Sequence, residues 1–155
     1  MEQSIQKFWD KQAGRYDRAE QQFSLVYNDI IVRTCKYLNE KDQVLDFGCA
    51  TGNKTMELAK KVRYIHGLDI SAEMIHQAIQ KKDESELTNV SFSQGTLSNA
   101  DFKKASFDKI VAFGIIHLLE DPEKELHRVN ELLKPGGFFI STTACMKEKM
   151  AFKTR

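Results

Sequence analysis

The sequence has few of the residues that would indicate a disulfide-stapled, membrane-spanning or strongly charged protein. Its three cysteines, Cys35, Cys49 and Cys145, are far apart and show no Cys-x-x-Cys spacing, so neither a disulfide framework nor a metal site is indicated. The 23 basic and 22 acidic residues leave a net charge of +1, which gives no general electrostatic reason to expect a nucleic acid partner. No apolar run approaches the roughly 18 residues that span a bilayer, and the polar N-terminus lacks the apolar core of a secretion signal. We therefore expect a cytoplasmic protein with no membrane contact.

What the chain does contain is an alternation of short apolar runs with amphipathic segments. Residues 1–42 are typical of a helical lead-in, with a break expected near Gly14. Residues 43–145 are typical of an α/β core, and residues 146–155 form a basic tail. Strand-like runs cover residues 44–47, 64–68, 90–92, 109–113 and 138–140. This alternation predicts a doubly wound, mostly parallel Rossmann-like sheet of about five strands, with helices on both faces and N-terminal helices. A single domain is expected over residues 1–155.

Two of the helical segments have well-marked starts. Ser71 stands at an N-cap position, and Asp121 precedes Pro122 at the first helical position, where proline is favoured. Glu123 and Glu125 fall in the first turn of the second segment, where the helix dipole favours acids. We therefore expect helices to begin directly after Ser71 and Asp121.

A glycine-rich turn follows the first strand-like run. Gly48 allows a sharp exit from the strand and a close approach of the backbone to a ligand, and Gly52 permits a tight start to the next helix. Asp69 follows about twenty residues later, at the end of the next strand, where a carboxylate can accept both hydroxyls of a ribose. It could equally cap the helix that follows.

Three nucleotide-binding patterns can be compared with this turn. A dinucleotide fold requires Gly-x-Gly-x-x-Gly, and Ala50 occupies the position of the middle glycine. A P-loop requires Gly-Lys-Ser/Thr after its second glycine, and Asn53 interrupts that register. The chain fits a third pattern, Asp-x-Gly-x-x-x-Gly with a strand-end acid, in which Asp46 could attract a cationic group.

These motifs together resemble those of the class I S-adenosylmethionine-dependent methyltransferases. Residues 44–52 are similar to the first motif of that family, residues 67–71 to its second, residues 107–111 to its fourth-strand signature and residues 128–137 to its post-motif turn. Phe8-Trp9-Asp10 and Tyr16-Asp17 are similar to the lead-in helix of many small-molecule members. The match covers nearly the whole chain in the right order. It implies transfer of a methyl group from S-adenosylmethionine to an acceptor.

The resemblance also implies roles for individual residues. Asp46 and the backbone around Gly48 would hold the methionyl group, with Tyr16 closing over its carboxylate, and Asp69 would bind the ribose. Thr96 stands where the family often has an acid that contacts the amino group of adenine. The cofactor-binding residues expected in this way are Tyr16, Asp46, Gly48, Cys49, Ala50, Gly52, Asp69, Ile70, Met74, Thr96, Leu97 and Phe113. Two of these have alternatives, because Met74 could be a core residue and Cys49 a small filler of the turn.

Methyl transfer demands little of the side chains, because in-line placement and desolvation can supply most of the catalysis. His117 follows the fourth predicted strand and could take a proton from the acceptor, or could simply pack at the strand end. The chain has no Asn-Pro-Pro-Tyr or Asp-Pro-Pro-Tyr after that strand and no Pro-Cys pair. In the family these features accompany methylation of nucleic acids, so a small-molecule acceptor is favoured, with protein and RNA acceptors left open.

The chain stops soon after the fifth predicted strand. The family's sheet normally continues through a further helix and two strands, which this sequence would lack. The apolar run 138–140 would then form an exposed edge, which invites pairing with a second chain unless a tail helix from Met146 onward covers it. A homodimer through this edge is therefore expected. Two other functions stay open: a module or fragment that binds the cofactor without catalysis, and a dinucleotide-binding protein.

Overall fold

The fold is built on one five-stranded sheet. The computed structural model describes residues 2–143 of the chain. Neighbouring strands are parallel throughout, in the order β3-β2-β1-β4-β5. The strands are β1 (Gln43–Phe47), β2 (Tyr64–Asp69), β3 (Val90–Gln94), β4 (Phe107–Phe113) and β5 (Leu133–Thr142). The predicted α/β architecture is confirmed.

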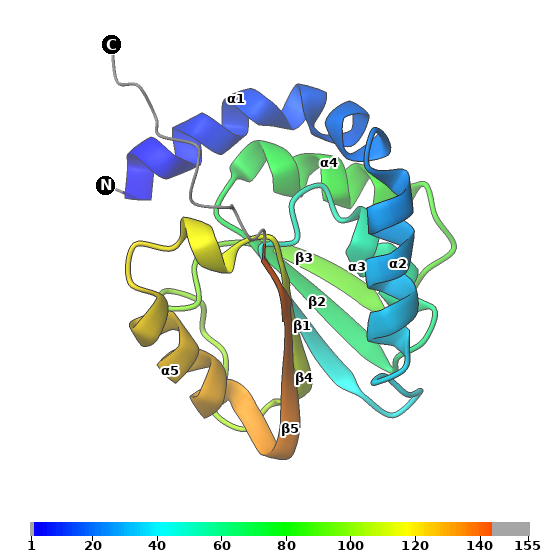
Figure 1. The fold of residues 1–155 in the computed structure, drawn as a ribbon, viewed down its shortest axis with the longest axis vertical. Coiled ribbons are helices and arrows are strands. Elements are labelled where there is room, and N and C mark those ends of the chain that lie inside the picture. The colour runs from blue at the N-terminus through cyan, green and yellow to red at the C-terminus, as the bar shows by residue number, and fades with distance from the viewer. Residues whose placement is uncertain (1, 144–155) are drawn as a thin grey trace.

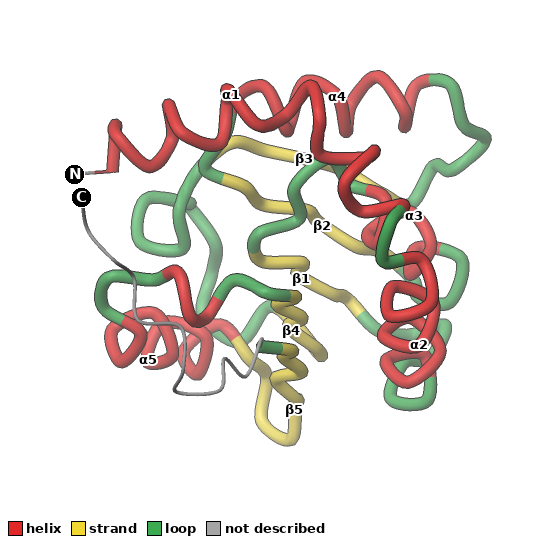
Figure 2. The backbone as a smooth tube through the Cα atoms, turned by 45° about the horizontal axis from the view of Figure 1, so that its top comes forward, coloured by secondary structure: helices red, strands yellow, loops and turns green. Residues whose placement is uncertain are grey.

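Helices cover both faces of this sheet. The helices α3 and α4 pack on one face and α5 on the other (Figure 1). The long helix α1 runs beside α4, and α2 packs beside α3 (Figure 2). The helical segments are α1 (Glu2–Gln21), α2 (Ser24–Cys35), α3 (Asn53–Ala59), α4 (Ala72–Asp83), the short 3-10 turn η1 (Ile116–Leu118) and α5 (Pro122–Leu132).

The two faces have separate hydrophobic cores. Side chains alternate between the faces of a strand, so Val44 and Leu45 point in opposite directions although both are fully buried. Leu45 packs in one cluster with Leu132 of α5, and Val44 packs in the other with Leu58 of α3. Burial on both faces explains why β1 shows a nearly continuous apolar run instead of an alternating one.

Helix boundaries agree with the sequence at two starts and differ in the lead-in. Ser71 Oγ accepts a hydrogen bond from the Met74 N–H at 3.1 Å, and Asp121 accepts one from the Lys124 N–H at 3.0 Å, which confirms both N-caps. The predicted break near Gly14 is wrong, because α1 is continuous through it. A helical glycine costs only about 1 kcal/mol relative to alanine, which tertiary contacts of α1 outweigh.

The fifth strand lies at the edge of the sheet in the part of the chain that is described. It begins at Leu133 instead of Phe138, because Leu133 already pairs with Phe107 before a register shift. Phe138 is 53% exposed on this edge. The tail for which a helix was predicted lies outside the described residues. Within residues 2–143, none of the helices combines the length and the apolar character of a membrane span.

Candidate functional site

A cavity of about 230 Å³ lies at the carboxyl ends of the strands, where ligands bind in open α/β sheets. One face of α1 covers it, because Glu2, Ile5, Trp9 and Tyr16 recur at helical spacing. The opposite wall comes from η1 and the start of α5. Its floor is formed by the ends of the strands and the turns that follow them, through Phe47, Gly48, Ala50, Asp69, Ile70, Gly95, Thr96, Phe113, Gly114 and Ile115.

The turn after β1 requires glycine at its first position. Gly48 has φ +78°, and a Cβ atom there would lie 2.4 Å from Ile115 Cδ1. The N–H groups of Gly48 and Cys49 donate to the Leu68 carbonyl at 2.8 and 3.1 Å, which ties the turn to the end of β2. Ala50 also lies at positive φ, +48°, a region that favours glycine. The backbone of the turn therefore forms one side of the cavity.

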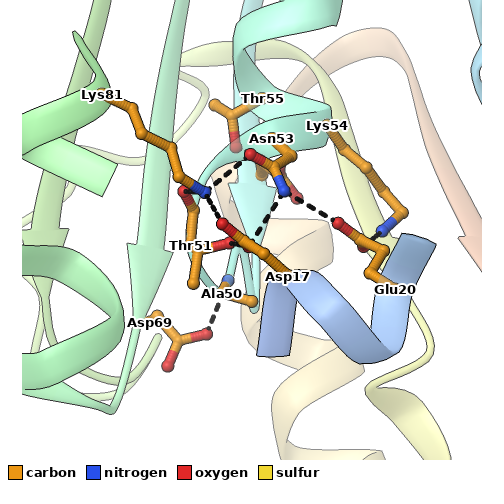
Figure 3. A network of polar contacts seen from close by, with 10 residues as sticks. Asp17, Glu20, Ala50, Thr51, Asn53, Lys54, Thr55, Asp69 and Lys81 are labelled. Atoms are coloured by element: carbon orange, nitrogen blue, oxygen red, sulfur yellow. Dashed lines mark hydrogen bonds and ion pairs between the residues drawn. The ribbon is translucent and has the colours of Figure 1, made fainter. Parts of the chain in front are cut away.

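Asp69 is fixed at the tip of β2 by backbone donors. Its Oδ2 accepts from the Ala50 N–H at 2.9 Å (Figure 3), and its Oδ1 accepts from the Ser71 N–H at 2.9 Å. Burial raises the pKa of Asp69, and these two hydrogen bonds oppose that rise. The carboxylate lines the cavity and has lone pairs left for further donors.

Asp46 lies on β1 just before the turn and is 1% exposed. Its Oδ2 accepts from Thr55 Oγ1 at 2.6 Å, while its Oδ1 has no hydrogen-bond partner among the described residues. Burial raises the pKa of Asp46 to about 6, although the Thr55 hydrogen bond and the charge of Lys54 act against that rise. An unpaired oxygen in such a buried carboxyl group favours a cation or a donor nearby.

Helix α1 is held over the turn by charged and polar groups (Figure 3). Asp17 accepts hydrogen bonds from Thr51 Oγ1 at 2.5 Å and Asn53 Nδ2 at 3.0 Å, and pairs with Lys81 Nζ at 2.5 Å. Burial acts to raise the pKa of Asp17, but the hydrogen bonds from Lys81 and Thr51 outweigh it and hold that pKa low. Glu20 accepts from Asn53 as well, at 3.0 Å. We call the α1 clamp the set Asp17, Glu20, Thr51, Asn53, Lys54 and Lys81.

The structure brings most of the predicted cofactor-binding residues to this cavity. Those that line it are Tyr16, Gly48, Ala50, Asp69, Ile70, Met74, Thr96 and Phe113. Asp46, Cys49, Gly52 and Leu97 are buried and are not among the lining residues. Burial raises the pKa of the Cys49 thiol, which suits a filler of the turn, and burial also raises the pKa of Tyr16, with the charge of Glu20 adding to the effect.

The predicted catalytic residue lies apart from these. His117 sits on η1, is exposed, and its Nδ1 is 3.2 Å from Thr143 Oγ1. It is not among the residues that line the cavity. Its role as a proton acceptor stays a prediction. Within residues 2–143, no group of acidic, histidine and cysteine side chains could hold a metal ion.

Several lining residues were not predicted from the sequence. Ile5 and Trp9 share one face of the lead-in helix, which is the signal that could have placed them on the cavity. Leu119 and Glu125 come from the segment after β4. The sequence did not indicate that Glu125 lines the cavity. Its position suggested only an acid in the first turn of a helix, where the helix dipole favours negative charge.

Comparisons with known proteins include a methyltransferase family model and a named methyltransferase. A family model described as a methyltransferase domain matches residues 38–154. The chain is 34% identical over 143 residues to an uncharacterised protein of Methanocaldococcus jannaschii, covering 90% of this chain and 51% of the relative. It is 29% identical over 143 residues to a demethylmenaquinone methyltransferase of Lactococcus lactis, covering 88% and 56%. The solved structure of the Bacillus subtilis YcgJ protein superposes with a TM-score of 0.70 at 28% identity, covering 74% of this chain and 50% of that one.

Proposed function

Because this chain belongs to the class I S-adenosylmethionine-dependent methyltransferase family, we propose that it binds S-adenosylmethionine in the cavity and transfers the methyl group to a small-molecule acceptor. The resemblance expected from the motifs is thereby confirmed. The chain spans 51% and 56% of the length of two curated relatives that it matches. Its own activity, acceptor and partners are therefore part of the proposal.

The observation that carries the proposal is a pair of buried acids at the ends of neighbouring strands. Asp69 is oriented by two backbone donors and faces the cavity, so it suits the two hydroxyl donors of a ribose. Asp46 has a buried oxygen without a partner among the described residues; it does not line the cavity itself, so its charge would act on the positive methionyl end through the turn that follows β1. The two residues thus match the two polar ends of one ligand, with the glycine turn between them.

The chain's own part in the reaction is to position the reactants and exclude water. When bound, S-adenosylmethionine supplies an electrophilic methyl carbon, which an acceptor lone pair can attack in line with the bond to sulfur. Ile5 and Trp9 on α1 and Ile115 beyond β4 line the cavity with apolar surface, which desolvates that approach. His117, exposed on η1, is the proposed acceptor of a proton from the methyl acceptor where the reaction requires one.

Calorimetric titration of the folded chain tests the binding step. S-adenosylmethionine and S-adenosylhomocysteine should both bind, whereas NAD should not, because Ala50 stands at the middle glycine of the dinucleotide pattern. Asp69→Ala should weaken binding by roughly 10- to 100-fold, the effect of losing hydrogen bonds to a charged group. Wild-type protein that is folded but binds neither adenosyl ligand would refute the proposal.

A second candidate is a module that binds the cofactor without catalysis. The observation that favours it is that the chain spans about half the length of these relatives. Incubation with methyl-labelled cofactor and a panel of small metabolites separates the two candidates. Label transferred to any metabolite supports the enzyme; tight cofactor binding with no transfer across the panel supports the module. A relative named for demethylmenaquinone supports including quinone precursors in the panel.

The proposal includes a homodimer and a cytoplasmic location. In the described part of the chain β5 pairs only with β4, and Phe138 is exposed on that edge, so a second copy could extend the sheet there. Light scattering across a concentration series should detect dimers, and a monomer at every concentration would contradict the pairing. Cys35 and Cys49 are free thiols, which supports a reducing compartment.

A further inference from the structure

The helix α2 is apolar on two sides, although a helix at the surface of a protein usually has one apolar side. On its inner side, Ile31 and Cys35 pack against the hydrophobic cluster on that face of the sheet. On its outer side, Leu25 is 85% exposed and Val32 is 60% exposed. Of the twelve residues of α2, all of which the structure describes, Thr34 alone is buried. The outer side of α2 is therefore apolar surface that the described part of the chain does not cover.

The exposed residues of α2 form one face with a regular spacing. Leu25, Asp29 and Val32 follow one another at intervals of four and three residues, which places them on one side of a helix. Arg33 lies beside them, because its Nε is 2.7 Å from Asp29 Oδ2 and both side chains are exposed. Tyr37, just past the end of the helix, is 59% exposed. We call these five residues the α2 face, and α2 lies at the periphery of the molecule, where a partner can reach it (Figure 2).

The order of these residues along the chain is symmetric about Ile31. Leu25 and Tyr37 lie six residues on either side of Ile31, and Asp29 and Arg33 lie two residues on either side of it. When two copies of a helix pack antiparallel across a two-fold axis at this level, each member of such a pair lies opposite the other member in the second copy. Apolar side chains then meet apolar side chains, and each acid meets a base.

We propose that the α2 face binds the α2 face of a second copy of this chain, in an antiparallel pair around a two-fold axis. Leu25 of one copy contacts Tyr37 of the other, and Val32 contacts its own counterpart near the axis. Asp29 of each copy forms an ion pair with Arg33 of the other. A partner of a different kind would have to supply a matching order of charges, whereas a second copy contains it. The charge complementarity therefore favours a second copy over an unlike partner.

Two further exposed residues fit the same arrangement. Lys36 and Val26 lie five residues on either side of Ile31, and Val26 is 58% exposed. The stem of a lysine can cover such a side chain while its ammonium group stays in water. One helix face buries less than the roughly 800 Å² per partner of a standard interface. We therefore expect a weak dimer, with a dissociation constant in about the micromolar range or above.

This pairing goes beyond the proposed function and does not depend on it, because no residue of the α2 face is among those that line the cavity. It also uses a different surface from the edge of β5, where Phe138 is exposed. A test of the α2 face must therefore be free of pairing through β5. For this reason every protein in the experiment carries Phe138→Lys.

Reversal of one charge at a time tests the pairing. Asp29→Arg makes the charged part of the α2 face wholly basic, and Arg33→Asp makes it wholly acidic. In sedimentation equilibrium each variant alone should dimerise about tenfold or more weakly than the chain with Phe138→Lys alone, because two attractive contacts become repulsive. An equimolar mixture of the two variants should form a heterodimer, in which a basic face meets an acidic face. Native mass spectrometry distinguishes this heterodimer from either homodimer by its mass.

The mixture separates the pairing from damage to the fold. Both variants break the ion pair within α2, so a loss of helix stability cannot explain dimers that return on mixing. Lys104→Glu is the matched control, because it reverses one charge of another exposed ion pair, with Glu131, and it should leave the dissociation constant unchanged. A chain with Phe138→Lys alone that is a monomer at every concentration up to about 1 mM would overturn this inference. A mixture that forms no heterodimer, or a dimer that neither reversal weakens, would overturn it as well.

Discussion

Replacement of Asp46 by asparagine should stabilise the ligand-free protein at neutral pH and weaken its binding of S-adenosylmethionine. The carboxyl group is almost fully buried, and one of its oxygens has no partner among the described residues. Asparagine has nearly the same shape and can still accept the hydrogen bond that Thr55 Oγ1 donates at 2.6 Å. It has no charge to desolvate, and no charge with which to attract a cation.

The pH dependence follows from the direction of the pKa change. Burial raises the folded-state pKa of Asp46 from the ordinary value of 3.8 to about 6, so the folded chain takes up this proton at a higher pH than the unfolded chain. The stabilising contribution is therefore fully present below about pH 3.8 and is lost as the pH rises through about 6. That pKa difference corresponds to about 3 kcal/mol of unfolding free energy. The amide NH₂ of the new asparagine would also lack a hydrogen-bond partner, which offsets part of this difference. We therefore expect Asp46→Asn to raise the free energy of unfolding by about 1–2 kcal/mol at pH 8.

Urea denaturation followed by circular dichroism, at several pH values between 5 and 8, measures this difference. The other acids titrate alike in both proteins, so their contributions cancel when the unfolding free energy of the variant is subtracted from that of the wild type. Asp69→Asn is the matched control, because Asp69 accepts two backbone N–H groups and asparagine cannot accept both with one oxygen, so this variant should be less stable than wild type. The reasoning would be refuted if Asp46→Asn were less stable than wild type at pH 8, or if the difference did not shrink as the pH falls to 5.

Three further changes test other parts of the structure. Gly48→Ala should lower the free energy of unfolding by about 2–4 kcal/mol, because positive φ strain adds to the clash with Ile115. Gly114 also has positive φ, but a Cβ atom there would meet nothing within 4 Å, so Gly114→Ala should lower the free energy of unfolding by only about 1–2 kcal/mol. Equal losses for the two variants in urea denaturation would show that the clash at Gly48 contributes nothing. Asp17→Asn should increase deuterium exchange in α1 while the strands stay protected, and unchanged exchange would mean that its ion pair is dispensable. Phe138→Lys should remove any dimer that forms through β5, as seen by light scattering, with some loss of stability because the Phe138 ring lies 4.9 Å from the buried Lys109 Nζ; a dimer that persists must use another surface.

The strand-end turn could be predicted because its requirements are local. The left-handed backbone at Gly48 and Gly52 demands the residue type that the sequence shows. The distance along the chain to Asp69 is fixed by one strand-helix-strand unit. The residue pattern and the spacing therefore suffice to predict that Asp69 lies beside the turn. In the structure the Ala50 N–H of the turn donates a hydrogen bond to the Asp69 carboxylate.

The remaining parts of the site depend on contacts that no local pattern encodes. Glu125 lines the cavity because α5 docks through Val129 and Leu132 in the core and through Arg128 on the loop after β3. Asp17 and Lys81 pair across separate helices. The continuity of α1 through Gly14 likewise reflects tertiary contacts that override helix propensity, so a prediction from propensity alone ended the helix too early.

The α1 clamp implies that charge, more than packing, governs access to the cavity. Ala13 is the one residue of α1 that is fully buried, so this helix gains little hydrophobic stabilisation from the body of the protein. Of its two ion pairs, Lys81–Asp17 is the more exposed and Lys54–Glu20 the more buried, so dissolved ions should weaken mainly the Lys81–Asp17 pair. We therefore expect α1 to open locally, and to open more readily at higher ionic strength. Ligand release should therefore become faster as salt is added, while the sheet beneath stays folded.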